Sequence, residues 1–128
     1  MSIVEAKCHN IPLWNIDFRV ADITGALWDG FDAVYSLDVL EHIKNDHSFL
    51  TAMWVAAPVA VIGTPSLESQ AHASRLSIEG HVNCYSGPDL KKRLQQYWSH
   101  VFMFTMHDEA IGTGFLPMAN YLLALCVK

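Results

Sequence analysis

The sequence is short of charge, of basic clusters and of long apolar runs, and each shortage excludes a class of protein. Only 16% of its 128 residues are charged while 52% are hydrophobic, which argues against a disordered chain. The net charge is −5 and the one basic run is at 91–93, so a nucleic-acid-binding face is not expected. No stretch approaches the length of apolar sequence that a membrane-spanning helix needs, so no membrane partner is expected either.

Cysteine is also scarce. Cys8, Cys84 and Cys126 are odd in number, far apart and in no Cys-x-x-Cys pair, which predicts free thiols in a reducing compartment. The first ten residues lack the charged and apolar regions of a signal peptide. We therefore expect a cytoplasmic location and one domain, over residues 1–128.

What the sequence does contain is an alternation of short apolar strands with amphipathic helices. The pattern predicts helices at 46–57 and 89–98. Strands are predicted at 16–23, 31–36, 59–65, 101–106 and 118–127. This order indicates an α/β fold with a mainly parallel sheet. The last two strands have no helix between them and are expected to form an antiparallel pair, with Gly-Thr-Gly at 112–114 in the connecting loop.

Three of the predicted strands end in polar residues, at 21–24, 36–42 and 63–66. In an open parallel sheet, ligands bind outside the carboxyl ends of the strands. If these strands are parallel, the three ends lie at the same edge of the sheet. The sequence therefore predicts one site there.

The run FDAVYSLDVLEHI at 31–43, followed by a helix and by VAVIGTPS at 59–66, resembles the second half of class I S-adenosylmethionine-dependent methyltransferases of the type 11/23 kind. The resemblance covers roughly residues 16–128 and implies a Rossmann-like sheet with S-adenosylmethionine as cofactor. It implies that Asp22 and Ile23 contact the adenine. It also implies that Ser36 and Leu37 lie beneath the methionine part of the cofactor.

The chain departs from that family at its start. The family holds its cofactor chiefly by a glycine-rich turn after the first strand, and no such turn precedes residue 16. The sequence thus resembles a methyltransferase domain that is incomplete at its N-terminus and lacks the first two strands of the sheet. We expect weak cofactor binding by this chain alone, and association into a homo-oligomer through the exposed sheet edge.

Asp38, Glu41 and His42 follow the strand at 31–36 and allow three interpretations. By the resemblance, they are catalytic residues that position a substrate or act as a general base. Alternatively, the three share one face of a helical turn and bind a divalent metal (magnesium, manganese or zinc) with His81 as a fourth ligand. Ubiquinone-pathway O-methyltransferases and small-RNA 2′-O-methyltransferases have a similar pattern. In the third interpretation, the acids cap backbone N–H groups and the imidazole is hydrogen-bonded inside.

These interpretations lead to three functions. The first is a methyltransferase that acts on a small molecule or a sugar. The second is a non-catalytic remnant that serves as a dimer or interaction module. The third is a metal-dependent hydrolytic site built on Asp38, Glu41, His42 and His81.

Overall fold

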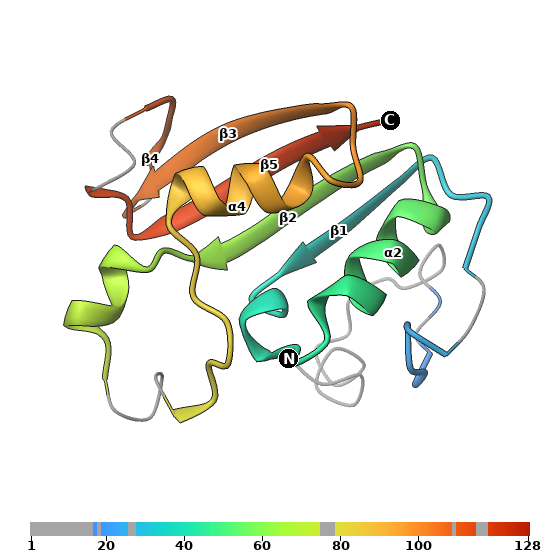
Figure 1. Cartoon of the computed structure of the whole chain (residues 1–128), viewed down its shortest axis with the longest axis horizontal. Helices are drawn as coiled ribbons and strands as arrows, with labels where there is room; N and C mark the ends of the chain where they lie inside the picture. Colours follow the sequence, from blue (N-terminus) through green and yellow to red (C-terminus); the bar gives the residue numbers. More distant parts are fainter. Residues whose placement is uncertain (1–16, 18, 26–27, 75–78, 109, 115–117) are drawn as a thin grey trace.

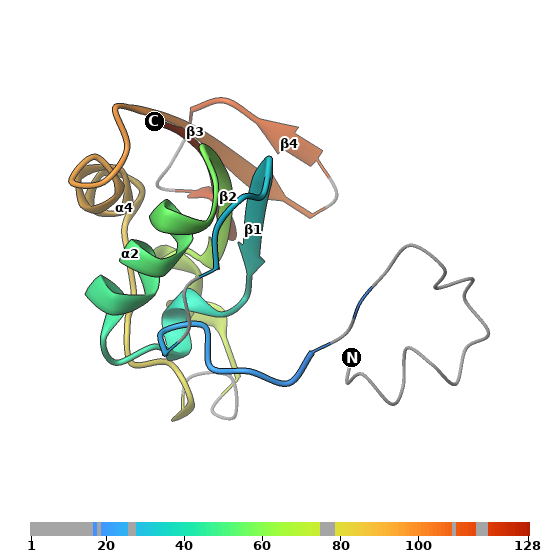
Figure 2. The same cartoon turned by 90° about the vertical axis from the view of Figure 1, so that its right-hand side faces the viewer.

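The computed structural model describes residues 17, 19–25, 28–74, 79–108, 110–114 and 118–128. It contains one five-stranded sheet with two α-helices packed on one face (Figures 1 and 2). The elements are β1 (Ala33–Leu37), the 3₁₀ turn η1 (Leu40–His42), α2 (Asp46–Ala56), β2 (Val59–Pro65), the 3₁₀ turn η2 (Glu68–His72), α4 (Gly87–Leu94), β3 (His100–His107), β4 (Ala110–Gly112) and β5 (Tyr121–Val127). No helix among the described residues has both the length and the apolar character needed to cross a membrane.

The strand order in the sheet is β1-β2-β5-β3-β4. β1 and β2 pair in parallel, whereas β5 is antiparallel to both of its neighbours, β2 and β3. β1, β2 and β3 therefore run in one direction, and β5 runs against them. This confirms the predicted Rossmann-like α/β class and the antiparallel C-terminal pair. Direct parallel pairing is limited to β1 and β2 because β5 lies between β2 and β3.

Two details of the predicted strand order are wrong. Residues 17 and 19–23, within the predicted first strand, form no strand, and Val20 is 95% exposed. Asp22 instead begins a turn, in which the Gly25 N–H donates to the Asp22 carbonyl. The apolar residues of this segment predicted a strand, but no described strand pairs with the segment. The three-residue strand β4 was missed, and Gly112, expected in a loop, is its last residue.

Both helices begin and pack as their sequences indicate. The Asn45 side chain caps α2 by accepting from the Ser48 N–H, and Ser86 caps α4 in the same way at Asp89. Both helices cover the face of the sheet that carries Ala60, Ile62, Leu122, Ala124 and Cys126. The core is completed by buried residues from the helices and their ends, namely Leu40, Phe49, Leu50, Met53, Leu90, Leu94 and Trp98.

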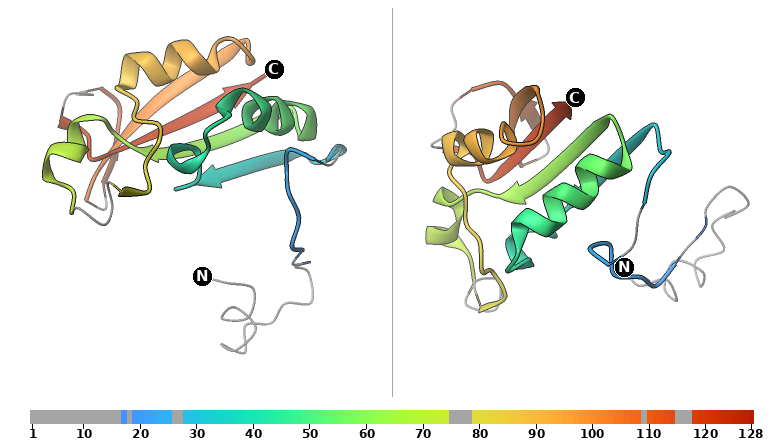
Figure 3. Two further views of the ribbon diagram at one scale, coloured as in Figure 1. Left: turned by 60° about the horizontal axis from the view of Figure 1, so that its bottom comes forward. Right: turned by 45° about the vertical axis from the view of Figure 1, so that its right-hand side comes forward.

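No described helix covers the opposite face of the sheet (Figure 2). The strand register places Tyr35, Val61, Leu125 and Phe102 in one row across this open face. Tyr35 is 77% exposed and Phe102 is 53% exposed. The free edge of β1 borders the same face (Figure 3). The described part of the chain thus presents an apolar surface with a free strand edge beside it.

Candidate functional site

The candidate site lies where β1 ends and η1 begins, beside the end of β2. Asp38 follows β1 directly and has a φ of 54°, which is the left-handed region that residues with a side chain rarely adopt. This residue turns the chain sharply before η1 begins at Leu40. The turn places Glu41 and His42 on the side of the sheet that the helices cover.

Glu41 is a buried carboxylate, with only 2% of its surface exposed. Its Oε2 accepts a hydrogen bond of 3.0 Å from the hydroxyl of Thr64, at the end of β2. Its Oε1 lies 3.8 Å from Nε2 of His42. One oxygen of Glu41 is therefore held by the sheet, and the other faces the imidazole.

The imidazoles of His42 and His81 are each oriented by a bond at Nδ1. Nδ1 of His42 lies 2.8 Å from the carbonyl oxygen of Gly80, which can only accept, so this nitrogen carries the hydrogen. Nδ1 of His81 lies 3.3 Å from Oε1 of Gln70. With Nδ1 of each ring engaged in this way, Nε2 is the nitrogen that could bind an ion, and the ring centroids are 4.9 Å apart.

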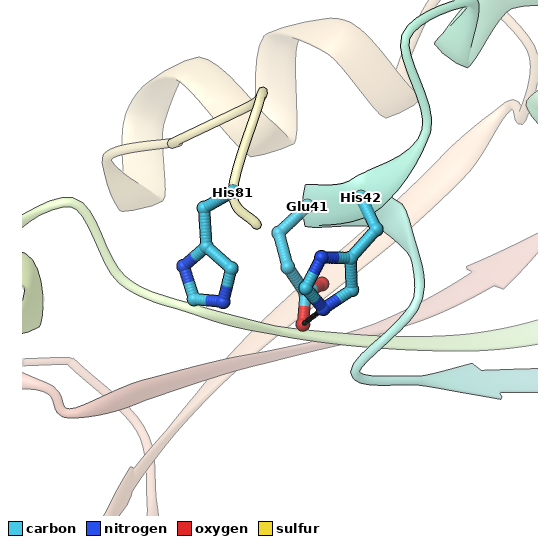
Figure 4. Close-up of side chains that lie close together, drawn as sticks. All are labelled: Glu41, His42 and His81. Atoms are coloured by element: carbon cyan, nitrogen blue, oxygen red, sulfur yellow. Dashed lines mark ion pairs between the residues drawn. The ribbon is translucent and has the colours of Figure 1, made fainter. Parts of the chain in front are cut away.

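Glu41, His42 and His81 converge, with one ligand atom from each lying within 4.8 Å of the others (Figure 4). We call these three residues the EHH cluster. In tetrahedral geometry, ligands about 2.1 Å from one ion lie about 3.4 Å apart, so the three atoms would have to move closer together to share an ion. Each ligand also has its second polar atom held by a hydrogen bond, as outer-shell partners do in metal sites. The three residues therefore supply donor atoms of the types that bind divalent metals, at separations longer than in a loaded site.

A loop before α4 brings His81 to η1 through backbone contacts. The N–H groups of Val82 and Asn83 both donate to the carbonyl of Glu41, at 2.7 and 3.0 Å. The Asn83 amide also donates to the carbonyl of Leu40 at 3.2 Å. A Cβ on Gly80 would lie 3.3 Å from the His42 ring, so this glycine lets the loop pack closely against the imidazole.

Asp38 lies outside the EHH cluster, which corrects the expectation that it shares a face with Glu41 and His42. The i, i+3, i+4 rule requires a continuous helix, and the left-handed backbone of Asp38 breaks it. The third interpretation is not supported either, because η1 has no side-chain cap and the Glu41 carboxylate binds a hydroxyl. His42 is hydrogen-bonded, as that interpretation expects, but its side chain is 47% exposed.

Sequence reasoning missed Tyr121, which meets Asp38 from β5. The Asp38 N–H lies 3.1 Å from the Tyr121 hydroxyl and 3.2 Å from the Gly63 carbonyl. Burial, and then the nearby Asp38 carboxylate, raise the pKa of Tyr121. A Cβ on Gly63 would lie 2.7 Å from the Tyr121 ring, so only glycine leaves room for it. A glycine inside an apolar strand was the available signal.

Three of the four residues expected at the cofactor come together. Ile23, Ser36 and Leu37 line a hollow of about 370 Å³ between β1 and α2. Ser36 is only 7% exposed, and its buried hydroxyl has no hydrogen-bond partner among the described residues. Asp22 is outside the hollow, and its carboxylate accepts from the hydroxyl and N–H of Thr24. The bonds from Thr24 lower the pKa of Asp22.

Comparison with known proteins was made by sequence and by structure. No protein-family model and no curated protein sequence matches the chain. A solved structure from Thermotoga maritima, described as an S-adenosylmethionine-dependent methyltransferase and possible histamine N-methyltransferase, matches 84% of the chain with a TM-score of 0.70 and 8% identity. Two structures of the methyltransferase domain of bacterial CtHen1 match 77% and 98% of it, with TM-scores of 0.55 and 0.68 and identities of 16% and 15%.

The fold is therefore that of the S-adenosylmethionine-dependent methyltransferases. The chain spans 61% of the Thermotoga protein, and 53% and 69% of the two CtHen1 chains.

Proposed function

We propose that this chain belongs to an S-adenosylmethionine-dependent methyltransferase that acts on a small molecule or a sugar. The observation that carries the proposal is the position of the EHH cluster in a methyltransferase fold, at the carboxyl end of β1. Ligand sites of open α/β sheets lie outside this end of the strands. The unsatisfied hydroxyl of Ser36, in the hollow beside the same strand, supports a cofactor site there.

In this proposal the two sides of the β1 end have different roles. Ile23, Ser36 and Leu37 contact the cofactor, whereas Asp22, expected at the adenine, lies outside the hollow that they line. Glu41, His42 and His81 would hold a divalent ion, which when bound would supply a Lewis acid on the helix-covered side of the β1 end. Asp38 is left outside the cluster, where its exposed carboxylate positions the acceptor or accepts its proton.

Metal binding is tested most directly by measuring the metal content and by titrating zinc, manganese and magnesium into the metal-free protein. Glu41→Gln and His81→Ala should each weaken binding at least tenfold, because each removes one ligand. His72→Ala is the matched control, since His72 is an exposed histidine on η2 outside the EHH cluster. Equal binding by all three variants would contradict the site.

Calorimetric titration with S-adenosylmethionine tests the cofactor. Because the sequence lacks a glycine-rich turn before residue 16, we expect this chain alone to bind weakly. Micromolar binding of S-adenosylmethionine would contradict that expectation but support the proposed methyltransferase function. Metal binding combined with hydrolysis of ester or phosphate substrates, and no response to S-adenosylmethionine, would favour the hydrolytic alternative.

A second candidate function is an interaction module that associates with its own copy, and the free edge of β1 favours it. The Asp38 N–H points to β2, so by alternation the backbone groups of Ala33, Tyr35 and Leu37 point away from it. β1 also carries no charge or proline to deter pairing. Light scattering should then report an oligomer that Tyr35→Lys disrupts, whereas Lys44→Glu, outside β1, does not. A monomer at all concentrations would contradict this candidate.

A further inference from the structure

A groove of about 500 Å³ lies on the open face, at the same end of the sheet as Asp38. Its floor is apolar and is made by Leu37, Met106 and Leu123. The register aligns Leu37 with Gly63, Gly63 with Leu123, and Met106 with Tyr121, so the groove spans the four neighbouring strands β1, β2, β5 and β3. A volume of this size suits a small organic ligand.

The rim of the groove is polar and acidic. Asp38 and Asp108 line it, together with the hydroxyl-bearing Tyr121 and the amide-bearing Asn120. Both aspartates are exposed and have left-handed backbones, with φ of 54° and 53°. The ion pairs that Arg or Lys makes among the described residues are Arg19–Asp17 and Arg93–Asp46, so neither rim aspartate is paired with such a cation. The groove thus combines an apolar floor with two unneutralised negative charges.

Tyr121 fixes the position of one of these charges. Its hydroxyl oxygen accepts from the N–H of Asp38, and its ring closes over Gly63. Since its pKa is raised, the hydroxyl stays neutral and can hold Asp38 in place over the ordinary pH range. Tyr121 is therefore a positioning residue, which acts on the ligand through Asp38.

We propose that this groove binds the methyl acceptor, and that the acceptor is an amphipathic amine. Its apolar part lies on Leu37, Met106 and Leu123, and its amine, protonated when it binds, lies beside Asp38 and Asp108. A rim carboxylate then takes a proton from the ammonium, the freed nitrogen lone pair bonds to the methyl carbon, and the S–C bond breaks to release S-adenosylhomocysteine. Charge complementarity selects this ligand, because the rim is acidic while the floor is apolar. The proposal rests on the proposed methyltransferase function in naming the ligand as the acceptor.

The test uses 2-phenylethylammonium as the probe, with 2-phenylethanol as a neutral control and 3-phenylpropionate as an anionic one. Binding to the full chain is followed by NMR, without S-adenosylmethionine. We expect the ammonium to bind about fivefold more tightly than the alcohol, with the anion weakest, because exposed ion pairs contribute modestly. Shifted amide signals should centre on Leu37, Asp38 and Leu123. Equal affinity for the three probes, or shifts centred elsewhere, would overturn the proposal.

Three variants and one control variant locate the residues that cause the preference for ammonium. Asp38→Asn and Asp108→Asn should each reduce the preference for ammonium over alcohol about two- to fivefold, while Asp29→Asn, an exposed acid outside the groove, should not. Tyr121→Phe should reduce that preference without weakening the binding of 2-phenylethanol. A merely structural role of Tyr121 would weaken the binding of both probes. Ammonium preference without cofactor binding would support the groove and count against the methyltransferase. Cofactor binding without ammonium preference would overturn the groove alone.

Discussion

Replacing Glu41 by glutamine should make the metal-free protein more stable. The Glu41 carboxylate is 2% exposed, and its only hydrogen-bond donor among the described residues is the hydroxyl of Thr64. A buried charge costs several kcal/mol, and one hydrogen bond to a charged group returns about 1.5–3 kcal/mol. The amide keeps a carbonyl oxygen for Thr64 and removes the charge. We expect a net gain of about 1–2 kcal/mol for Glu41→Gln.

For a chain of 128 residues, this gain corresponds to a rise in Tm of about 4–7 °C. The assay is thermal unfolding followed by circular dichroism, with a chelator present, against Glu79→Gln as the exposed matched control. With saturating metal, the wild type should have the higher Tm. An ion at one hundred times its Kd stabilises the wild type by about 2.7 kcal/mol and Glu41→Gln far less. A lower Tm for Glu41→Gln in chelator would refute the reasoning, and so would equal stabilisation of both proteins by metal.

Three further predictions follow from single contacts. Gly63→Ala should lower the free energy of unfolding, measured in urea, by about 1–3 kcal/mol, because its Cβ would lie 2.7 Å from Leu37 and Tyr121. Gly80→Ala should weaken metal binding about tenfold in a titration, because it displaces the His42 ring. The bonds from Arg93 lower the pKa of Asp46, so this pair stabilises the fold above about pH 4 and is lost as the pH falls further. Acid unfolding curves of wild type and Asp46→Asn should therefore differ at neutral pH and converge at low pH.

The helices and central strands could be predicted because their signals are local. β2 has the predicted bounds, since an apolar β-branched run ends at Gly63 and Pro65. Asn45 and Ser86 likewise mark the helix starts. The strand expected at 16–23 does not form at the described residues 17 and 19–23, because its signal was not sufficient locally. Alternation indicates a strand only where a neighbouring strand can pair with it, and that neighbour is not encoded in the segment itself.

Part of the candidate site could be predicted from the sequence and part could not. The spacing of Glu41 and His42 and the nearby polar loop indicated a cluster with His81, which the structure brings together. The separation of Asp38 from that cluster depends on one left-handed backbone angle, which its sequence context did not indicate. Tyr121 lies 83 residues from Asp38, so the contact between them follows from the sheet order alone.

The loop that carries His81 is attached to η1 largely through its backbone. The Val82 and Asn83 N–H groups and the Gly80 carbonyl make these bonds, while the Val82 side chain is 49% exposed and makes none of them. Substitutions at Val82 can therefore accumulate without moving the imidazoles. The positions of His42 and His81 thus depend on the backbone path of residues 80–83 and tolerate a change of side chain at 82.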